Sequence, residues 1–398
     1  MNTKTIKKLK RVIPVSFIVL FAAFLAIPNT GLYRGEKNAR LIAQTENRRI
    51  TPRPTQSLKS KEFYEQFEKW YQDRLRYRDT AIKLWRQGNL HIGVILNSSI
   101  IVGKNKWLLD KNACLRNFVD AENKIKKIKA LQDYCNKHNK SFILLVPPNK
   151  ESVYRDYFPE QIQLNYKTPE YFQNESENLF KKYQINYLSV TDLIATQRQT
   201  EKHDLYFSDD HHWSYFAASA AADMLMQKLN KELHTNFYQG LKFDGTSKIA
   251  TKEHSYATKL ALNYTDKTIA PWSNNYTNEI YISDSYTNKI EKAKTVVANN
   301  YLWERMLKGE GIVINKTINN NISLLILGDS YSSYMVPYLS QNVKKIITTH
   351  YRDCIENKKE VNTQKLFKKY DPDAVVLIIN ETNFFHSSSE NIFHNLKF

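Results

Sequence analysis

Three uninterrupted apolar runs constrain the fold of this chain more than any other feature. They occupy residues 142–146, 324–327 and 374–379. A short apolar run without alternation is typical of a strand buried on both faces, as in a parallel sheet. Helices are predicted over residues 120–138, 168–183, 215–229, 334–341 and 362–370, and further short strands over 185–190 and 346–349. This alternation of helices and strands predicts an α/β sheet covered by helices.

The N-terminal region has the charge pattern of a membrane anchor. Five basic residues within the first 11 positions precede residues 12–33, a stretch of 22 positions without a charge. As a helix with about 1.5 Å of rise per residue, this stretch would span roughly 33 Å, about one hydrocarbon core. The basic flank predicts a cytoplasmic N-terminus, with the rest of the chain in the periplasm or otherwise outside the cytoplasm. A cleaved signal peptide is the alternative, although Phe24-Leu25-Ala26 fits a cleavage site poorly. We expect residues 1–34 to be a single-pass signal-anchor in the cytoplasmic (inner) membrane.

Beyond the anchor we predict one large domain. Residues 35–60 are polar and contain two prolines, which is typical of a linker. The domain, residues 61–398, would begin with an amphipathic helix over 61–86. Residues 236–320 differ from the rest because they are rich in Tyr, Asn, Thr and Lys and contain short alternating runs. They predict a β- and loop-rich insertion that could form a sugar-binding surface, with plain solvated loops as the alternative.

Composition limits the classes of partner. Charged residues make up 25% and apolar residues 42%, as in an ordinary globular protein, and the formal net charge is +18. A basic balance suits nucleic acid, an anionic membrane surface or an acidic polymer. The chain has no zinc-finger spacing, no RNA-recognition signature and no dense block of Lys and Arg, so nucleic acid is the weakest of the three. Its three cysteines, Cys114, Cys135 and Cys354, offer neither a metal-ligand pattern nor a disulfide scaffold.

Residues 209–212, Asp-Asp-His-His, place two carboxylates beside two imidazoles. A carboxylate can fix the tautomer of a histidine and stabilise its charged form, so Asp210 could orient His212 as a general base. Two residues of separation would put both side chains on one side of an extended segment. Ser214 is the predicted N-cap of the helix that follows. The pair could equally be structural or half of a metal site, but adjacent ligands cannot all face one ion, so no metal is expected.

The best candidate for a nucleophile is Ser330, in the sequence Gly328-Asp329-Ser330. It follows the apolar run at 324–327 directly, so it would lie at the carboxyl edge of the sheet and at a helix start. There the hydroxyl is exposed, and backbone N–H groups can stabilise an oxyanion. A serine hydroxyl needs a base to become a good nucleophile, and His212 would supply it. Each motif is weak by itself, because both sequences are common.

Several segments, in order along the chain, strengthen this interpretation together. They are Glu46-Asn47-Arg48 with Pro52; Asp73 with Arg76 or Arg78; Gly103-Lys104-Asn105-Lys106-Trp107-Leu108; Val146-Pro147-Pro148-Asn149-Lys150 with Tyr154 and Pro159; Tyr206 with Asp210-His211-His212-Trp213; Gly328-Asp329-Ser330-Tyr331-Ser332; and Asp371-Pro372-Asp373-Ala374 with Asn380-Glu381. This set resembles the SGNH hydrolase-like acetyltransferases of the alginate O-acetylation type, the AlgJ/AlgX group. The resemblance covers about residues 44–235 and 322–385.

The order of the motifs agrees with this family. Ordinary SGNH hydrolases place Gly-Asp-Ser first and an Asp-x-x-His block near the C-terminus, whereas here Asp-x-His-Trp precedes Gly-Asp-Ser. The resemblance implies an SGNH hydrolase-like (flavodoxin-like) three-layer sandwich with a mainly parallel sheet and a circularly permuted motif order. Only 68 residues follow Ser330, which resembles the AlgJ-type arrangement more than AlgX-like members with an added carbohydrate-binding domain.

The resemblance also implies a chemistry. Ser330 would accept an acetyl group as an ester and pass it to a hydroxyl of alginate or another exported cell-envelope polysaccharide, with His212 and Asp210 completing the triad and no cofactor. Tyr331, Asn380 and Trp213 are the expected contacts to donor, substrate or oxyanion. A membrane-bound O-acyltransferase would be the partner that supplies acetyl groups. An exported carbohydrate acetylesterase with the same triad and a non-catalytic envelope scaffold remain the alternatives.

Overall fold

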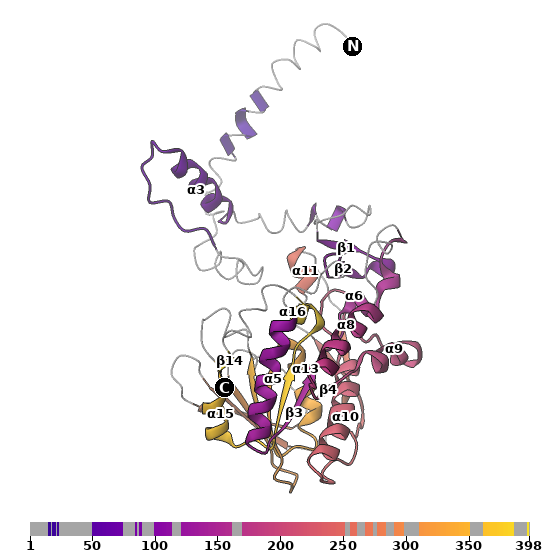
Figure 1. Ribbon diagram of the computed structural model, residues 1–398. Helices are drawn as coiled ribbons and strands as arrows, with labels where there is room; N and C mark the ends of the chain where they lie inside the picture. The colour runs from indigo at the N-terminus through magenta and orange to yellow at the C-terminus, as the bar shows by residue number, and fades with distance from the viewer. Residues whose placement is uncertain are drawn as a thin grey trace. The chain divides into compact units, whose positions relative to one another are not determined.

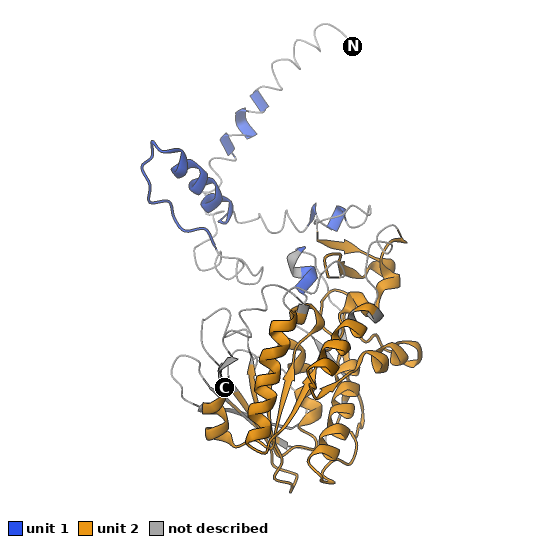
Figure 2. Ribbon diagram, viewed as in Figure 1, with its two compact units in different colours: residues 1–98, 255–264 blue, residues 99–254, 265–398 orange. Residues whose placement is uncertain are grey.

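The chain divides into two compact units, residues 1–98 with 255–264 and residues 99–254 with 265–398 (Figure 2). A computed structural model describes residues 50–74, 99–113, 121–160, 169–250, 255–260, 267–273, 277–283, 290–297, 310–350, 361–385 and 396–397, with a few positions within 15–23 and 84–89 (Figure 1). Most of the predicted anchor, residues 12–33, lies outside this description. Among the described residues, no helix is both long and apolar enough to cross a membrane.

The first unit contains the amphipathic helix α3, Lys61–Gln72. Phe63, Phe67 and Trp70 line one side of it, with neighbouring ring centroids 5.8 and 5.7 Å apart. The predicted apolar face is therefore confirmed. The helix ends at its C-cap Asp73, earlier than the predicted end at residue 86.

Asp73 and Arg74 hold the preceding linker against the end of α3. The carboxylate of Asp73 accepts a hydrogen bond from the backbone N–H of Thr51 at 2.7 Å. The guanidinium of Arg74 donates to the carbonyl of Thr51 at 3.2 Å. Arg76 and Arg78, the partners that the sequence suggested for Asp73, lie outside the described residues.

An eight-stranded mixed sheet forms the centre of the second unit, in the order β4-β3-β13-β10-β11-β9-β7-β8. The strands are β3 (Ser141–Leu145), β4 (Tyr187–Leu188), β7 (Thr277–Ser283), β8 (Ile290–Val297), β9 (Glu310–Asn315), β10 (Ser323–Gly328), β11 (Lys345–His350) and β13 (Ala374–Ile378). The first five strands in that order are parallel, while β9, β7 and β8 pair antiparallel. The mainly parallel sheet predicted from the apolar runs is confirmed. Three of its strands come from residues 236–320, so this region extends the sheet.

Helices pack on both faces of the sheet because successive residues of a strand point to opposite sides. The covering helices are α5 (Ala121–Lys137), α8 (Pro169–Lys182), α10 (Tyr215–Glu232), α13 (Ser330–Leu339) and α15 (Thr363–Tyr370). Leu324 and Ile326 of β10 belong to one core with α10 and α13. Leu325 and Leu327 belong to the other core, with α5, α8 and α15. The arrangement is α/β with a helical layer on each face, and it can be followed in Figure 1.

A small antiparallel hairpin precedes the sheet in the chain. It consists of β1 (Ile100–Val102), the single 3-10 turn η2 (Lys104–Lys106) and β2 (Leu108–Asp110). Asn105 in the turn has a φ of 55°, in the left-handed region that asparagine tolerates better than most residues.

The remaining described elements are short. They are α6 (Lys150–Val153), η3 (Arg155–Tyr157), α9 (Thr191–Thr200), β5 (Gly245–Ala250), α11 (Ser255–Lys259), β6 (Lys267–Trp272), β12 (Val361–Asn362), α16 (Glu381–Phe385) and β14 (Leu396–Lys397). β5 and β6 pair with each other and do not join the main sheet.

The order in which the chain adds strands to the sheet reverses at β10. It leaves β10 through α13 to β11 on one side, and then returns through α15 to β13 on the other side. The two connecting helices lie on opposite faces of the sheet. A crevice forms outside the carboxyl ends of strands at such a reversal, and it is the usual ligand site of open α/β sheets. Ser330 lies two residues beyond the carboxyl end of β10.

Candidate active site

The structure brings Ser330, His212 and Asp210 into one hydrogen-bonded row. His212 Nδ1 lies 2.6 Å from Asp210 Oδ1, and His212 Nε2 lies 2.6 Å from Ser330 Oγ. An ionised carboxylate only accepts hydrogen bonds, so Nδ1 carries the imidazole proton and Nε2 accepts from the serine hydroxyl. Asp210 and His212 are buried, with 0% and 2% of their surfaces exposed. This geometry permits His212 to take the proton of Ser330.

The loop that carries Asp210 and His212 is closed at both ends by backbone pairing. Tyr206 and Trp213 form an isolated antiparallel bridge, and the N–H of Phe207 donates to the carbonyl of His212 at 3.2 Å. Asp210 Oδ1 also accepts the backbone N–H of His212 at 2.8 Å. The segment is thus a tight turn, and the extended conformation expected from the sequence is wrong. The local Asp210 bond to the backbone two residues ahead explains the difference.

Ser214 holds the expected N-cap position of α10, but it does not act through its side chain. Its carbonyl accepts the N–H of Ala218 at 3.0 Å, while its hydroxyl makes no cap hydrogen bond. The buried face of α10 consists of small and aliphatic residues that pack against α13, including Ala217, Ala218, Ala221 and Leu225.

Ser330 is the first residue of α13, because Asp329 caps that helix. Asp329 Oδ1 accepts the backbone N–H of Tyr331 at 3.0 Å. The helix was expected to begin at residue 334, and this cap starts it four residues earlier. Gly328 is required just before it: a Cβ there would lie 2.8 Å from both Cβ and Oγ of Ser332. The strand can therefore pass into the helix closely enough to place Ser330 at the sheet edge.

Asp329 also joins the ends of β10 and β13. Its Oδ2 accepts the backbone N–H of Asn380 at 2.6 Å and the side-chain amide of Asn383 at 3.1 Å. The side chain of Asn380 in turn donates to the carbonyl of Pro147 at 3.2 Å, beyond the end of β3. Three neighbouring strand ends are therefore fixed to one another immediately behind Ser330.

The three contact residues expected from the sequence are held by the protein itself. The Asn380 side chain also accepts the N–H of Thr382 at 2.9 Å. Trp213 Nε1 donates to the carbonyl of Tyr331 at 3.1 Å, and the Tyr331 hydroxyl donates to the carbonyl of His211 at 2.5 Å. All three side chains are buried, and burial raises the pKa of Tyr331 well above its ordinary value. These hydrogen bonds hold the catalytic segments in place, and contact of the three residues with donor, substrate or oxyanion stays a prediction.

The start of α13 offers one amide for an oxyanion. The N–H of Tyr331 is occupied by Asp329. The N–H of Ser330 is the first of the helix, and the helix provides no acceptor for it. The Ser330 amide is therefore the backbone donor that the described geometry assigns to a developing oxyanion.

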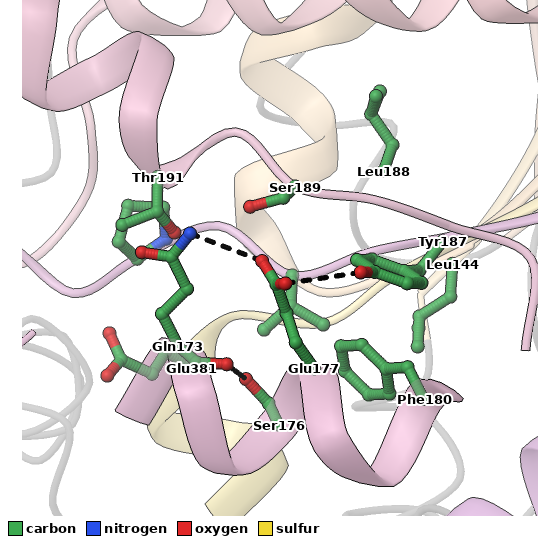
Figure 3. A pocket seen from close by; sticks show the side chains of 12 residues that line it. Leu144, Gln173, Ser176, Glu177, Phe180, Tyr187, Leu188, Ser189, Thr191 and Glu381 are labelled. Carbon is green, nitrogen blue, oxygen red and sulfur yellow. Dashed lines mark hydrogen bonds between the residues drawn. The ribbon is translucent and has the colours of Figure 1, made fainter. Parts of the chain in front are cut away.

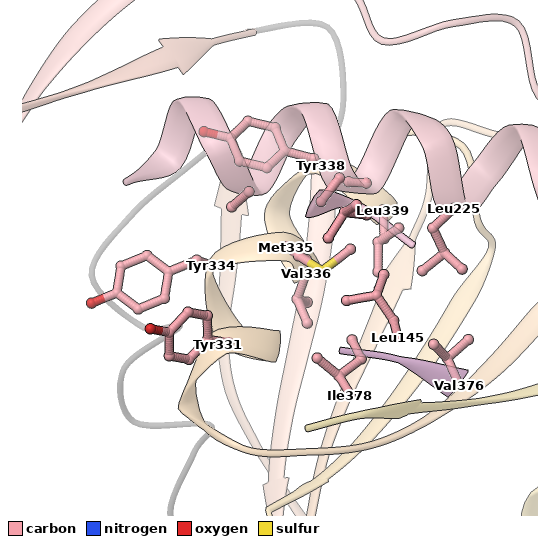
Figure 4. Packing of buried hydrophobic residues seen from close by; sticks show 14 of the residues in the cluster. Leu145, Leu225, Tyr331, Tyr334, Met335, Val336, Tyr338, Leu339, Val376 and Ile378 are labelled. Carbon is pink, nitrogen blue, oxygen red and sulfur yellow. The ribbon is translucent and has the colours of Figure 1, made fainter. Parts of the chain in front are cut away.

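Aromatic side chains stand beside His212. The ring of Tyr334 lies 5.2 Å from the ring of His212, and Phe207 and Tyr215 lie 5.7 and 5.1 Å from Tyr334. Phe207 and Tyr215 are half-buried. Figure 4 shows Tyr331 and Tyr334 projecting from α13 on the side away from the aliphatic core. These rings give the site an aromatic wall, composed of Phe207, Tyr215 and Tyr334.

Asp210, His211 and His212 also form a compact group of potential metal ligands. One ligand atom of each lies within 4.8 Å of the others. However, the same Asp210 oxygen already accepts two hydrogen bonds from His212, and His212 Nε2 meets Ser330. The atoms that would bind an ion are thus engaged in the triad, and the geometry fits proton transfer better than metal binding.

A small cavity lies between α8 and the end of β3 (Figure 3). Its volume of about 30 Å³ leaves room for about two water molecules. Glu177 accepts hydrogen bonds from Gln173 and Tyr187 across it, each at 3.2 Å. No triad residue lines this cavity, so it is not the catalytic pocket.

Sequence reasoning missed the site's most unusual residue, Lys150. Its ammonium donates to the carbonyls of Phe207, Ser208 and Asp210, at 3.0, 3.3 and 2.7 Å. Lysine is almost never fully buried, so no sequence pattern pointed to this position. Its place after two prolines, in a segment already noted for its family resemblance, was the only signal available.

Comparison with known proteins finds one matching family model and several structures with a similar fold. Residues 100–290 match the family model described as the SGNH hydrolase-like domain of acetyltransferase AlgX. A DHHW family protein from Eubacterium siraeum is 17% identical, covering 73% of this chain and 93% of its own length, with a TM-score of 0.55. PatB1 from Bacillus cereus is 19% identical, covering 73% and 99%, with a TM-score of 0.53. PatB1 with a sulfonyl adduct is 18% identical, covering 75% and 100%, with a TM-score of 0.52. No curated protein sequence matches.

The matched region contains the turn Asp210-His211-His212-Trp213, and it ends before Ser330. The three similar structures cover 73–75% of this chain and show that it has a known fold. Residues 100–290 thus resemble the SGNH hydrolase-like domain of the acetyltransferase AlgX, and this match supports a family of the alginate O-acetylation type.

Proposed function

We propose that this protein is an O-acetyltransferase that transfers acetyl groups to polysaccharide hydroxyls through an ester of Ser330. The observation that carries the proposal is the row of two 2.6 Å contacts from Asp210 through His212 to Ser330. The family match supports acetyl transfer as the reaction class. The aromatic wall beside His212 supports a sugar acceptor, since aromatic faces pack well against the apolar faces of sugar rings.

The proposed reaction has two half-steps. In the first, His212 Nε2 takes the proton of Ser330 Oγ, and Oγ forms a bond to the acetyl carbonyl carbon. The bond from that carbon to the donor's leaving group then breaks, and the leaving group takes the proton from His212. Asp210 stabilises the imidazolium between these events. The Ser330 amide stabilises the oxyanion.

In the second half-step the acceptor hydroxyl repeats this sequence. His212 takes its proton, its oxygen bonds to the acetyl carbon, and the ester bond to Ser330 breaks. Ser330 Oγ then recovers the proton from His212, so the enzyme returns to its starting state. Water in place of the sugar would make the same site an acetylesterase, which is the second candidate function.

We place the domain outside the cytoplasm, attached to the membrane through residues 12–33. The uncharged stretch and its basic flank support this location. A membrane-bound O-acyltransferase would then be the partner that brings acetyl groups across the membrane. The net charge of +18 suits an acidic glycan as the acceptor.

The first test uses the full chain in detergent with p-nitrophenyl acetate. Intact mass and released nitrophenol are recorded for wild type and Ser330→Ala, with and without oligosaccharides. We expect a covalent acetyl adduct that depends on Ser330 and is discharged faster by sugar than by water. Ser219→Ala is the matched control, since the hydroxyl of that buried serine of α10 donates to the nearby carbonyl of Phe216. Discharge to water at the same rate with or without sugar would favour the esterase, and absence of an adduct would contradict both functions.

A further inference from the structure

Lys150 is a fully buried cation in contact with the loop that carries the catalytic pair. None of its surface is exposed. Its Nζ makes hydrogen bonds to three carbonyls of that loop, those of Phe207, Ser208 and Asp210. An ammonium has three donor hydrogens and no acceptor, so each hydrogen can serve one carbonyl. The side chain thus holds the backbone of the loop at three carbonyls, which lie on both sides of Asp209.

The surroundings of Lys150 are anionic and aromatic. Asp209, Asp210 and Glu151 are all buried and each attracts the ammonium, and the ring of Trp107 lies 5.5 Å from Nζ. Several buried carboxylates in one place require a compensating charge. Lys150 supplies a compensating cation within the described core. Burial nevertheless dominates and lowers the pKa of Lys150 to about 8.

We propose that Lys150 is a positioning residue for the reaction: its ammonium holds the loop 207–210 so that Asp210 and His212 reach Ser330. This inference rests on the proposed function only in taking Ser330 as the nucleophile. The contacts lie on backbone carbonyls, so the ammonium sets the position of the loop and takes no part in the proton transfer itself. A shift of about 1 Å in a catalytic group can lower a rate about 100-fold.

The protonation state of Lys150 makes the proposal testable without any variant. A neutral amine keeps two hydrogens and gains a lone pair, so it cannot donate to all three carbonyls. One carbonyl of the loop then faces a lone pair instead of a donor. The reactivity of Ser330 should therefore fall as the pH rises through about 8, the value to which burial lowers the pKa of Lys150.

The experiment measures labelling of Ser330 in the full chain by phenylmethylsulfonyl fluoride, followed by intact mass from pH 6 to 10. Sulfonylation forms the bond from Oγ to sulfur and expels fluoride while His212 takes the proton, so it reports the nucleophile without requiring acetyl transfer. We expect Lys150→Met to slow labelling by about 10- to 100-fold and to lose the decline near pH 8. Lys150→Arg, which stays charged, should recover part of the rate and also lack the decline.

Lys124→Met is the matched control. Lys124 is also buried, with 1% exposed, but its Nζ donates to the carbonyl of Phe384 and its helix packs on the other face of the sheet. In the Lys124→Met variant, Ser330 should be labelled at the wild-type rate, within about twofold. The rate should still decline as the pH rises through about 8. Wild-type labelling that stays constant from pH 7 to 10 would overturn the proposal even if Lys150→Met did not fold. Equal rates in Lys150→Met and wild type would do the same. Absence of any labelling at Ser330 would contradict the proposed nucleophile itself, which separates the two failures.

Discussion

At the scale of single residues, the position of Ser330 depends on the two residues before it. Gly328 leaves space for Ser332, and Asp329 caps the helix while holding the end of β13. The nucleophile is therefore fixed by steric fit and by one carboxylate, which uses both oxygens. Neither Gly328 nor Asp329 needs to touch the substrate to affect the reaction.

Gly328→Ala is predicted to impair both stability and activity. A Cβ at this position would overlap with Ser332, and relieving the overlap moves the start of α13, at a cost of about 1–3 kcal/mol in the free energy of unfolding. Urea unfolding and the rate of Ser330 labelling would measure the two effects. Gly88→Ala is the control, because a Cβ there meets no atom within 4 Å and alanine suits its helical backbone, so this variant should not lose stability. A stable, fully active Gly328→Ala protein would contradict the steric argument.

At the scale of elements, the β1–β2 hairpin supports the catalytic loop from outside the sheet. The backbone N–H of Leu108 donates to the carbonyl of Ser208 at 2.8 Å. The neighbouring Trp107 is buried and stacks on Tyr154 with ring centroids 4.3 Å apart. Tyr154 continues the contact, because its hydroxyl accepts the N–H of Leu205 at the start of the loop. The hairpin and the loop therefore pack as one layer around Lys150.

Trp107→Ala should uncouple this hairpin from the loop. Loss of a buried Trp side chain costs about 3–5 kcal/mol in the free energy of unfolding. Because the lost contacts lie against Tyr154 and Lys150, labelling of Ser330 should also slow, measured per folded molecule at low denaturant. Trp107→Phe keeps a ring against Tyr154 and should retain most of both properties. If Trp107→Ala lost stability but labelled Ser330 at the wild-type rate, the hairpin would have no part in positioning the loop.

At the scale of the whole molecule, the fold buries charged groups such as Lys150 near a sheet that has an apolar core on each face. The sheet is covered on both faces, so the strand ends that carry Ser330, Asp329 and Asn380 are surrounded by packed side chains. Burial then raises the pKa of Tyr206 and Tyr331, which keeps their hydroxyls protonated as donors. The same burial disfavours the charged form of Lys150, so this cation makes the stability of the protein depend on pH.

The unfolding free energy of wild type relative to Lys150→Met should increase with pH. Below pH 8 Lys150 is protonated in both states, and its full burial cost is present. Between the folded pKa of about 8 and the ordinary value of 10.5, only the unfolded state binds the proton, so stability rises with pH. Across this pH window the unfolding free energy of wild type relative to Lys150→Met should rise by on the order of 3 kcal/mol. Urea titrations of both proteins at pH 7.5, 9 and 10.5 would measure it. A difference that does not change with pH would show that burial does not lower the pKa of Lys150.

Much of the fold and the three triad residues could be predicted from local sequence. The apolar runs became β3, β10 and β13 because a strand buried on both faces favours apolar residues at nearly every position. The amphipathic pattern of residues 120–138 became α5 for a similar reason, since its apolar residues recur at the helical period. Asp210, His212 and Ser330 were candidates because of their residue types, and the resemblance of the ordered segments to a known family singled them out.

What only the tertiary structure decided depends on contacts between distant parts of the chain. Asn380 binds the carbonyl of Pro147, 233 positions away, and so became a positioning residue. The alternating runs in residues 236–320 predicted strands, but only the fold shows that one of them, β9, pairs with the edge of β11. Lys150 meets a loop about 60 residues further along, and its burial follows from the carboxylates gathered there. By itself the sequence determined which residues could react and which strands would be buried, because those properties are local. Their distances, donors and charges were set by the fold, because burial and hydrogen bonding depend on what the rest of the chain brings alongside.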